Sequence, residues 1–113
     1  MHELSLAISL LDLLEERACL DAFERVQKII LEVGELSGVS IPALRQGFEV
    51  ATKGTIAEGA EMDILEPPGT GWCFTCEQTV AIKDPFRTCP GCGKSAVTPT
   101  GGLEFRVVEL VVS

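Results

Sequence analysis

Four cysteines in two Cys-x-x-Cys pairs are the side chains of this sequence best suited to chemistry. Cys73 pairs with Cys76 and Cys89 pairs with Cys92, and twelve residues separate the two pairs. A two-residue spacing lets both sulfurs of a pair face one ion, and two such pairs complete a tetrahedron of thiolates. Four soft sulfur donors favour Zn(II) and leave no open position for a substrate. We therefore predict a structural zinc site held by all four cysteines.

Other uses of these cysteines stay open at this point. An iron–sulfur cluster or a rubredoxin-type iron takes the same four-thiolate set. A redox Cys-x-x-Cys needs a thiol at a helix N-terminus, whereas these pairs lie in a stretch that contains glycine and proline. The fifth cysteine, Cys19, falls near the end of an expected helix, and we predict that it is a small buried hydrophobe.

The N-terminus offers a second donor set, formed by Met1, His2 and Glu3. A bulky second residue is expected to keep the initiator methionine, so that the free α-amine belongs to Met1. That amine, the deprotonated His2 amide and the His2 imidazole can form fused chelate rings, and the amide or carboxylate of Glu3 can supply a fourth donor. A nitrogen-rich planar set suits Ni(II) or Cu(II), and affinity order alone favours copper. A lone histidine is also a common surface residue, and that interpretation stays open.

Two helices are expected to position these donors. Apolar residues recur at helical spacing over residues 3–19, with a stripe formed by Leu4, Ile8, Leu11, Leu14 and Ala18 and widened by Leu6, Leu10 and Leu13. Ser40 is a candidate N-cap, with Pro42 in the first turn, for a second helix that ends near Gly54.

Three strands are expected at residues 25–33, 62–66 and 103–112, and Ile29, Leu31 and Val33 should share the buried face of the first. Strand, helix and strand over residues 25–66 make a βαβ unit, for which parallel pairing is the default. We predict an α+β fold: two helices on one face of a small three-stranded mixed sheet, with an inserted four-cysteine, zinc-ribbon-like module. The predicted domains are an α/β domain of residues 1–70 and 103–113, which carries the N-terminal metal donors, and a zinc-binding module of residues 71–102. That module shows little periodic apolar pattern and is too small to bury a core without a metal.

Charge and composition argue against several classes of function. The chain has 113 residues, with 17 acidic and 9 basic side chains, a net charge of −8 and 5% aromatic residues. That field repels nucleic acid and anionic lipid, and few aromatic rings are available to stack on bases. No apolar run approaches the roughly 20 residues of a membrane span, and we expect a cytoplasmic protein whose N-terminus is mature as written. A zinc-ribbon nucleic-acid module would need a basic face, and a small enzyme would need a nucleophile or an acid–base pair.

Four short motifs in order make the whole chain resemble the HypA/HybF family of hydrogenase-maturation nickel metallochaperones. They are Met1-His2-Glu3-Leu4-Ser5, Val33-Gly34-Glu35-Leu36-Ser37, Cys89-Pro90-Gly91-Cys92-Gly93 and Gly102-Leu103-Glu104-Phe105. Each motif is short, but their joint arrangement is specific.

The resemblance implies nickel delivery to [NiFe]-hydrogenase and, in some lineages, to urease. It implies that Met1, His2 and Glu3 bind nickel and that the four paired cysteines bind zinc. The partners it implies are the GTPase HypB and the hydrogenase large subunit, with the exposed face of the N-terminal helix as the expected docking surface and a monomer or homodimer as the expected state. This sequence departs from many relatives at Glu77, where they have glycine after the first cysteine pair, and it has no histidine beside the cysteines.

Overall fold

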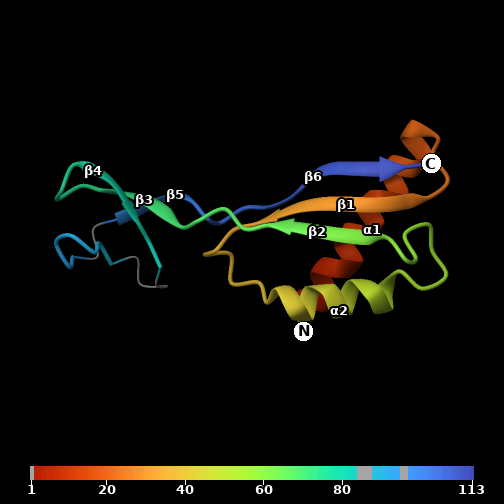
Figure 1. The fold of residues 1–113 in the computed structure, drawn as a ribbon, viewed down its shortest axis with the longest axis horizontal. Helices are drawn as coiled ribbons and strands as arrows, with labels where there is room; N and C mark the ends of the chain where they lie inside the picture. The colour runs from red at the N-terminus through yellow and green to blue at the C-terminus, as the bar shows by residue number, and fades with distance from the viewer. Residues whose placement is uncertain (1, 84–87, 95–96) are drawn as a thin grey trace. The chain divides into compact units, whose positions relative to one another are not determined.

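The structure is a computed structural model that describes residues 2–83, 88–94 and 97–113. These residues form two helices and two three-stranded sheets (Figure 1). The helices are α1 (His2–Asp21) and α2 (Ile41–Ala51). The first sheet has the order β2-β1-β6, with β1 at Val26–Val33, β2 at Glu61–Leu65 and β6 at Phe105–Val112. The second has the order β4-β3-β5, with β3 at Thr70–Cys73, β4 at Gln78–Ala81 and β5 at Val97–Gly101.

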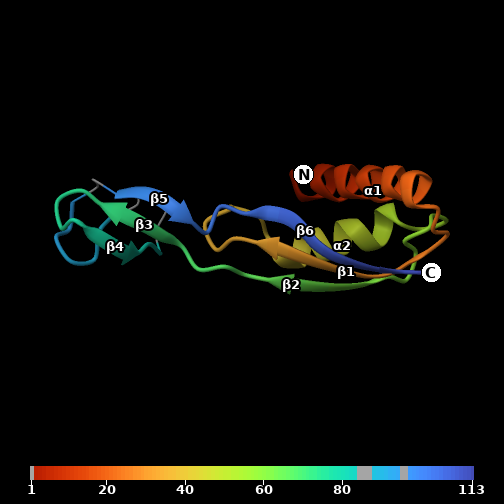
Figure 2. The same ribbon diagram turned by 90° about the horizontal axis from the view of Figure 1, so that it is seen from above.

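The first sheet is mixed, as the βαβ pattern predicts. Strands β1 and β2, which α2 connects, run in the same direction, whereas β6 runs in the opposite direction (Figures 1 and 2). The antiparallel pairing of β6 begins where Ser113 N–H donates to the Arg25 carbonyl at 3.0 Å and Arg25 N–H donates to the Ser113 carbonyl at 3.2 Å. The predicted fold class is therefore confirmed.

Both helices lie on one face of this sheet (Figure 2). Helix α2 begins as predicted, because the Ser40 hydroxyl accepts a hydrogen bond from the Ala43 N–H at 3.4 Å and a proline occupies the first turn. It buries Leu44 and Phe48. Below the helices β1 contributes its predicted inner face, in which Ile29, Leu31 and Val33 are each at most 1% exposed.

The buried face of α1 differs from the predicted stripe. The buried residues are Ala7, Leu10, Leu11 and Leu14, while Leu4, Ile8 and Leu13 are 40%, 47% and 44% exposed. Apolar residues surround most of this helix, so periodicity alone did not identify the face that packs. The buried face depends on where α2 packs against α1. The two helices approach closely at Gly47, where an added Cβ would lie 3.4 Å from the Leu4 Cα and 3.6 Å from the Ala7 Cβ. In the part of the chain that is described, no helix is long and apolar enough to cross a membrane.

The second sheet lies within the cysteine segment, where no strands were predicted. Strand β3 is its centre and pairs antiparallel with β4 and with β5. One face buries a cluster made of Cys73, Ile82, Cys89 and Val97, against which Leu36 packs. The strands have only four or five residues each, which is too short for alternation to be recognised in the sequence.

The chain divides into two compact units. Unit 1 comprises Met1–Leu31, Val39–Asp63 and Val107–Ser113, and unit 2 comprises Glu32–Gly38 and Ile64–Arg106. Unit 1 therefore contains both helices, and unit 2 contains the second sheet and all four paired cysteines. It stays a prediction that the chain has two separate metal-binding domains, one of residues 1–70 with 103–113 and one of residues 71–102.

Candidate metal sites

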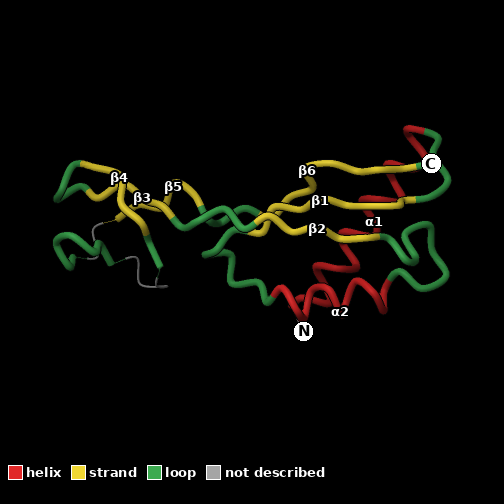
Figure 3. The backbone as a smooth tube through the Cα atoms, viewed as in Figure 1, coloured by secondary structure: helices red, strands yellow, loops and turns green. Residues whose placement is uncertain are grey.

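The four paired cysteines meet in unit 2. Cys73 ends β3, Cys76 lies in the turn that leads to β4, and Cys89 and Cys92 flank a turn that precedes β5. Both turns appear as loops in Figure 3. Each cysteine offers one Sγ atom, and the four atoms all lie within 4.8 Å of one another. The structure thus brings together the cysteines that the spacing pairs.

The separations between sulfurs fit a tetrahedral ion. Sγ of Cys73 lies 3.7 Å from Sγ of Cys92, and Sγ of Cys76 lies 3.9 Å from Sγ of Cys89. Four thiolates at the usual zinc–sulfur distance of about 2.3 Å form a tetrahedron whose edges are about 3.8 Å long. Both distances join one pair to the other, so the cluster can hold one ion between two turns. All five cysteines are free thiols.

Each turn presents a backbone N–H to its first sulfur. Cys76 N–H donates to Sγ of Cys73 at 3.4 Å, and Gly91 N–H donates to Sγ of Cys89 at 3.3 Å. Amide donors stabilise a thiolate, which is the form that binds a metal. Neither pair precedes a helix in the described part of the chain, so the setting of a redox Cys-x-x-Cys is not found there.

The two turns close in the same way although one has glutamate where the other has glycine. Glu77 N–H donates to the Cys73 carbonyl at 2.8 Å, and Gly93 N–H donates to the Cys89 carbonyl at 2.8 Å. Both residues have positive φ, 53° for Glu77 and 71° for Gly93. A non-glycine residue in this left-handed region costs about 1–2 kcal/mol. The departure at Glu77 therefore keeps the geometry of the turn but adds strain.

This strain predicts opposite effects for two substitutions. Glu77→Gly is expected to increase the free energy of unfolding of unit 2 by about 1 kcal/mol, because glycine adopts positive φ without a steric cost. Gly93→Ala is expected to lower it by a similar amount. Chemical denaturation of both variants, followed through the fluorescence of Trp72, measures the two shifts. A loss of stability in Glu77→Gly would contradict the assignment of strain.

Hydrogen bonds shift the pKa values of two of the thiols in opposite directions. The backbone N–H groups of Cys92 and Gly91 donate to Cys89 and lower its pKa to about 7, although burial of the thiol opposes this. Hydrogen bonds with the thiols of Cys73, Cys92 and Cys89 raise the pKa of Cys76 to about 12. Cys89 therefore loses its proton more readily than Cys76. A bound cation stabilises the thiolate form, so metal uptake should release protons and weaken as the pH falls.

Cys19 lies apart from this cluster, on α1 in unit 1. Its side chain is exposed, so the prediction that it is a buried hydrophobe was wrong. The reason is that α1 buries a different face from the predicted one. That buried face is made of Ala7, Leu10, Leu11 and Leu14.

The predicted N-terminal site falls at the start of α1. Met1 lies outside the described residues. The helix begins at His2, whose side chain is 62% exposed, and the first turn of an α-helix has no preceding carbonyl to accept its N–H groups. The amides of His2 and Glu3 therefore have no acceptor earlier in the helix, and the Glu3 N–H instead forms a hydrogen bond with its own carboxylate. His2 Nδ1 lies 3.7 Å from Oε2 of Glu3.

The Glu3 carboxylate connects the start of α1 to the start of α2. Its Oε2 accepts a hydrogen bond from the Ser40 N–H at 3.0 Å. This backbone hydrogen bond is the main cause that holds the pKa of Glu3 below its usual range. The contact is therefore made by the ionised carboxylate and is lost when acid protonates it. This contact went unpredicted, because the two residues are 37 positions apart.

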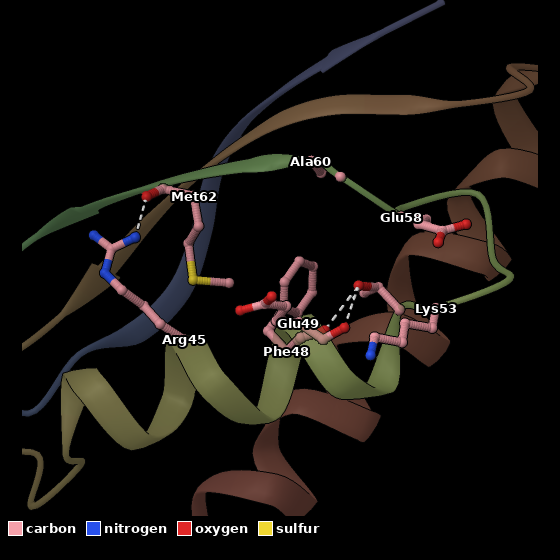
Figure 4. Close-up of a pocket in the computed structure, with 9 residues that line it drawn as sticks. Arg45, Phe48, Glu49, Lys53, Glu58, Ala60 and Met62 are labelled. Carbon is pink, nitrogen blue, oxygen red and sulfur yellow. Dashed lines mark hydrogen bonds between the residues drawn. The ribbon is translucent and has the colours of Figure 1, made fainter.

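A cavity of about 510 Å³ lies between α2 and the segment that leads into β2 (Figure 4). Arg45 spans its rim and donates from Nη1 to the Met62 carbonyl at 2.6 Å. Phe48 and Met62 supply apolar surface, and Glu49 and Lys53 supply charge. The described residues that line it include no cysteine or histidine, so they offer no soft donors for a metal.

Comparison with known proteins identifies the family. A family model described as HypA, "Hydrogenase/urease nickel incorporation, metallochaperone", matches residues 1–112. The hydrogenase maturation factor HypA of Azotobacter chroococcum is 46% identical over 112 residues, and that of Dechloromonas aromatica is 44% identical over 112 residues. Each of these alignments covers 99% of both chains.

Two solved structures share the fold. A solution structure of a HypA protein superposes with a TM-score of 0.73 at 24% identity and covers 100% of this chain and 97% of its own. The solution structure of the Ni metallochaperone HypA from Helicobacter pylori superposes with a TM-score of 0.68 at 22% identity and covers 97% of this chain and 96% of its own. From the match to the family model and from these relatives, the chain belongs to the HypA family of nickel-incorporation metallochaperones.

Proposed function

We propose that this protein binds Ni(II) at its N-terminus and delivers it during the maturation of [NiFe]-hydrogenase. The observation that carries the proposal is the start of α1 at His2, within a chain that belongs to the HypA family over residues 1–112. An exposed imidazole and the amides of the first helical turn lie within reach of one ion. The Met1 amine completes a planar nitrogen set with them, and such a set suits Ni(II).

The Glu3 carboxylate supports this site from outside the nickel plane. Since its Oε2 already accepts from the Ser40 N–H, its amide nitrogen is the better candidate for the fourth donor. The carboxylate then keeps the start of α1 beside the start of α2 and orients the donors that precede it. Met1, His2 and Glu3 are thus the proposed nickel-binding residues.

Zinc is the proposed resident of the four-cysteine cluster and serves a structural role. The sulfur separations of 3.7 and 3.9 Å match a zinc tetrathiolate, and an ion with four protein ligands has no open position for chemistry. In the buried cluster that the described residues of unit 2 form, two of the four members are cysteines, so a metal bound to them would stabilise the cluster directly.

One proposed partner is the GTPase HypB, which would supply nickel and whose nucleotide state would control when nickel is transferred. The other is the hydrogenase large subunit, which would accept the nickel. The relatives are named hydrogenase maturation factors, which supports transfer to a maturing hydrogenase. The family description also includes urease, and we propose urease as a second possible destination. We propose further that the protein acts as a carrier and not as an enzyme, and that it works in the cytoplasm.

Hydrogenase activity in cells tests the delivery step. A strain that lacks its own maturation factor is expected to regain hydrogenase activity when it expresses this chain, and to remain inactive when it expresses His2→Ala. Added nickel should partly restore activity in the strain without the chain and in the strain with His2→Ala, because a high nickel concentration makes delivery by a carrier less necessary. Cys19→Ser serves as the control and should restore activity fully, since Cys19 is exposed and distant in sequence from both sites. Full activity with His2→Ala would contradict nickel delivery through the N-terminus.

A further inference from the structure

Strand β6 leaves one edge of the first sheet unpaired. In the described part of the chain it pairs with β1 alone, because the sheet order is β2-β1-β6. Its eight residues include neither proline nor lysine, the residues that commonly protect such edges. The opposite edge is shorter, since β2 has five residues, and it carries the charged residues Glu61 and Asp63. An eight-residue edge with free N–H and C=O groups can accept another strand.

A groove beside this edge would receive the side chains of an added strand. It has a volume of about 410 Å³ and lies between the C-terminal half of α1 and β6, within unit 1. Its α1 wall includes Leu13 and Leu14, its β6 wall includes Leu110 and Val112, and Phe23 closes one side. In Figure 1 the C-terminal end of α1 projects beyond β6 near the end of that strand, so the helix covers one end of the position that a fourth strand would take.

Exposed apolar side chains occur on both walls of this groove. Leu13 on α1 is 44% exposed and Val108 on β6 is 49% exposed, and both line the groove. Leu20 on α1 is 68% exposed and does not itself line the groove. Leu13 and Leu20 are seven positions apart and therefore share one face of the helix. An added strand would bury these side chains against its own, which is favourable because apolar surface is removed from water.

Charge around the groove selects its occupant. Unit 1 has eleven acidic and five basic side chains. The one arginine in the groove, Arg17, is neutralised by Asp21 at 2.9 Å. Exposed carboxylates then remain at Glu109 on β6 and at Glu16, which is adjacent on the helix surface to both Leu13 and Leu20. A second copy of this chain would bring the same negative charge to the edge, whereas a basic segment would complement it.

We infer that the β6 edge and the α1 groove bind an extended segment of a partner protein in which apolar and basic residues alternate. The segment adds a fourth strand to the sheet. Its apolar residues face α1 and contact Leu13, Leu20 and Phe23, and its basic residues face the other side, near Glu109. Backbone hydrogen bonds to β6 supply general affinity, and the groove and the carboxylates supply selectivity. This surface uses none of the candidate metal ligands.

Binding of a defined peptide to the full zinc-loaded chain tests this inference. The probe is a fluorescein-labelled peptide of eight residues that alternates valine and lysine, matched in length to β6. Fluorescence anisotropy is expected to show saturable binding. The same peptide with N-methyl groups on the amides that face β6 should bind at least about tenfold more weakly, because it cannot pair with the strand. A peptide with glutamate in place of lysine should lose a similar factor through repulsion.

Matched protein variants test the groove. The double variant Leu13→Gln with Leu20→Gln is expected to weaken binding by about tenfold or more, because it places one polar amide in the groove wall and a second on the exposed apolar face of α1 that continues from Leu13. Leu4→Gln is the control, since Leu4 is 40% exposed on the same helix but does not line the groove. It should bind the probe as the unaltered chain does. Zinc content and circular dichroism confirm that each variant is folded.

Several results would overturn the inference. Failure of the probe to bind the unaltered chain would do so, as would equal affinity for the N-methylated peptide or equal affinity in the double variant. Equal binding of the glutamate peptide would show that the carboxylates near the groove do not favour a basic segment, which contradicts a basic partner. A concentration-dependent dimer in sedimentation, dispersed by the double variant, would assign this edge to a second copy of the chain instead.

Discussion

Cys89→Ser is expected to release the bound metal and unfold unit 2 while the helices of unit 1 persist. Among the described residues, the buried cluster of unit 2 comprises Cys73, Ile82, Cys89 and Val97, so half of it consists of candidate metal ligands. A structural zinc contributes on the order of 10 kcal/mol of folding free energy, which is comparable to the whole stability of a typical domain. Zinc should therefore fall from one ion per chain to none. Amide hydrogen exchange should show that protection is lost in β3 and β5 and retained in α2.

The control for this experiment is Cys19→Ser, which changes the same side chain at an exposed position. It should retain one zinc ion per chain and the full exchange protection of unit 2. Full zinc retention in Cys89→Ser would remove Cys89 from the ligand set. Loss of protection throughout both units would show instead that unit 1 does not survive without the metal.

Adding a single glycine before Met1 is expected to abolish specific nickel binding although every side chain remains. The extension moves the free amine away from the His2 imidazole and destroys the first chelate ring. His2→Ala should have the same effect, because it removes the imidazole donor. Isothermal titration of zinc-loaded protein should show one Ni(II) site in the unaltered chain and none in either variant. Since the ligands must lose protons, nickel affinity should also fall as the pH is lowered.

The matched control adds the same glycine after Ser113, at the other end of the chain. Nickel binding should then be unchanged, and zinc should stay at one ion per chain in all of these proteins, because the cysteines lie in unit 2. Equal nickel affinity with and without the N-terminal glycine would rule out the terminal chelate. A protein stabilised by zinc that acts through its surfaces would then be the better description.

Patterns that depend on near neighbours predicted the structure well. The Ser40 cap, the inner face of β1 and the pairing of the cysteines all follow from spacings of a few residues, and the structure places each as expected. The separation of the sulfurs follows from two short turns, so the candidate zinc site could be assigned before any coordinates. The nickel residues stay a prediction, because they rest on chemistry at a terminus and on resemblance.

Features that depend on distant parts of the chain could not be predicted. The strands of the second sheet are short, and β3 pairs with β5 across more than twenty residues. Helix α1 is apolar over much of its surface, so its buried face depends on where α2 packs and not on its own period. The hydrogen bond from Ser40 to Glu3 likewise forms only when the starts of the two helices meet.

The position of β6 in the chain also sets the order in which this protein can be completed during synthesis. Its partner β1 leaves the ribosome well before β6, and Ser113, which follows β6, forms hydrogen bonds with Arg25. The cysteine segment is translated between them. Unit 2 can therefore fold and take up its ion while one flank of β1 is still bare, and a folded unit 2 shortens the flexible loop that β6 must close when it returns to β1. Strand β6 thus completes the first sheet only after the cysteine segment has been translated.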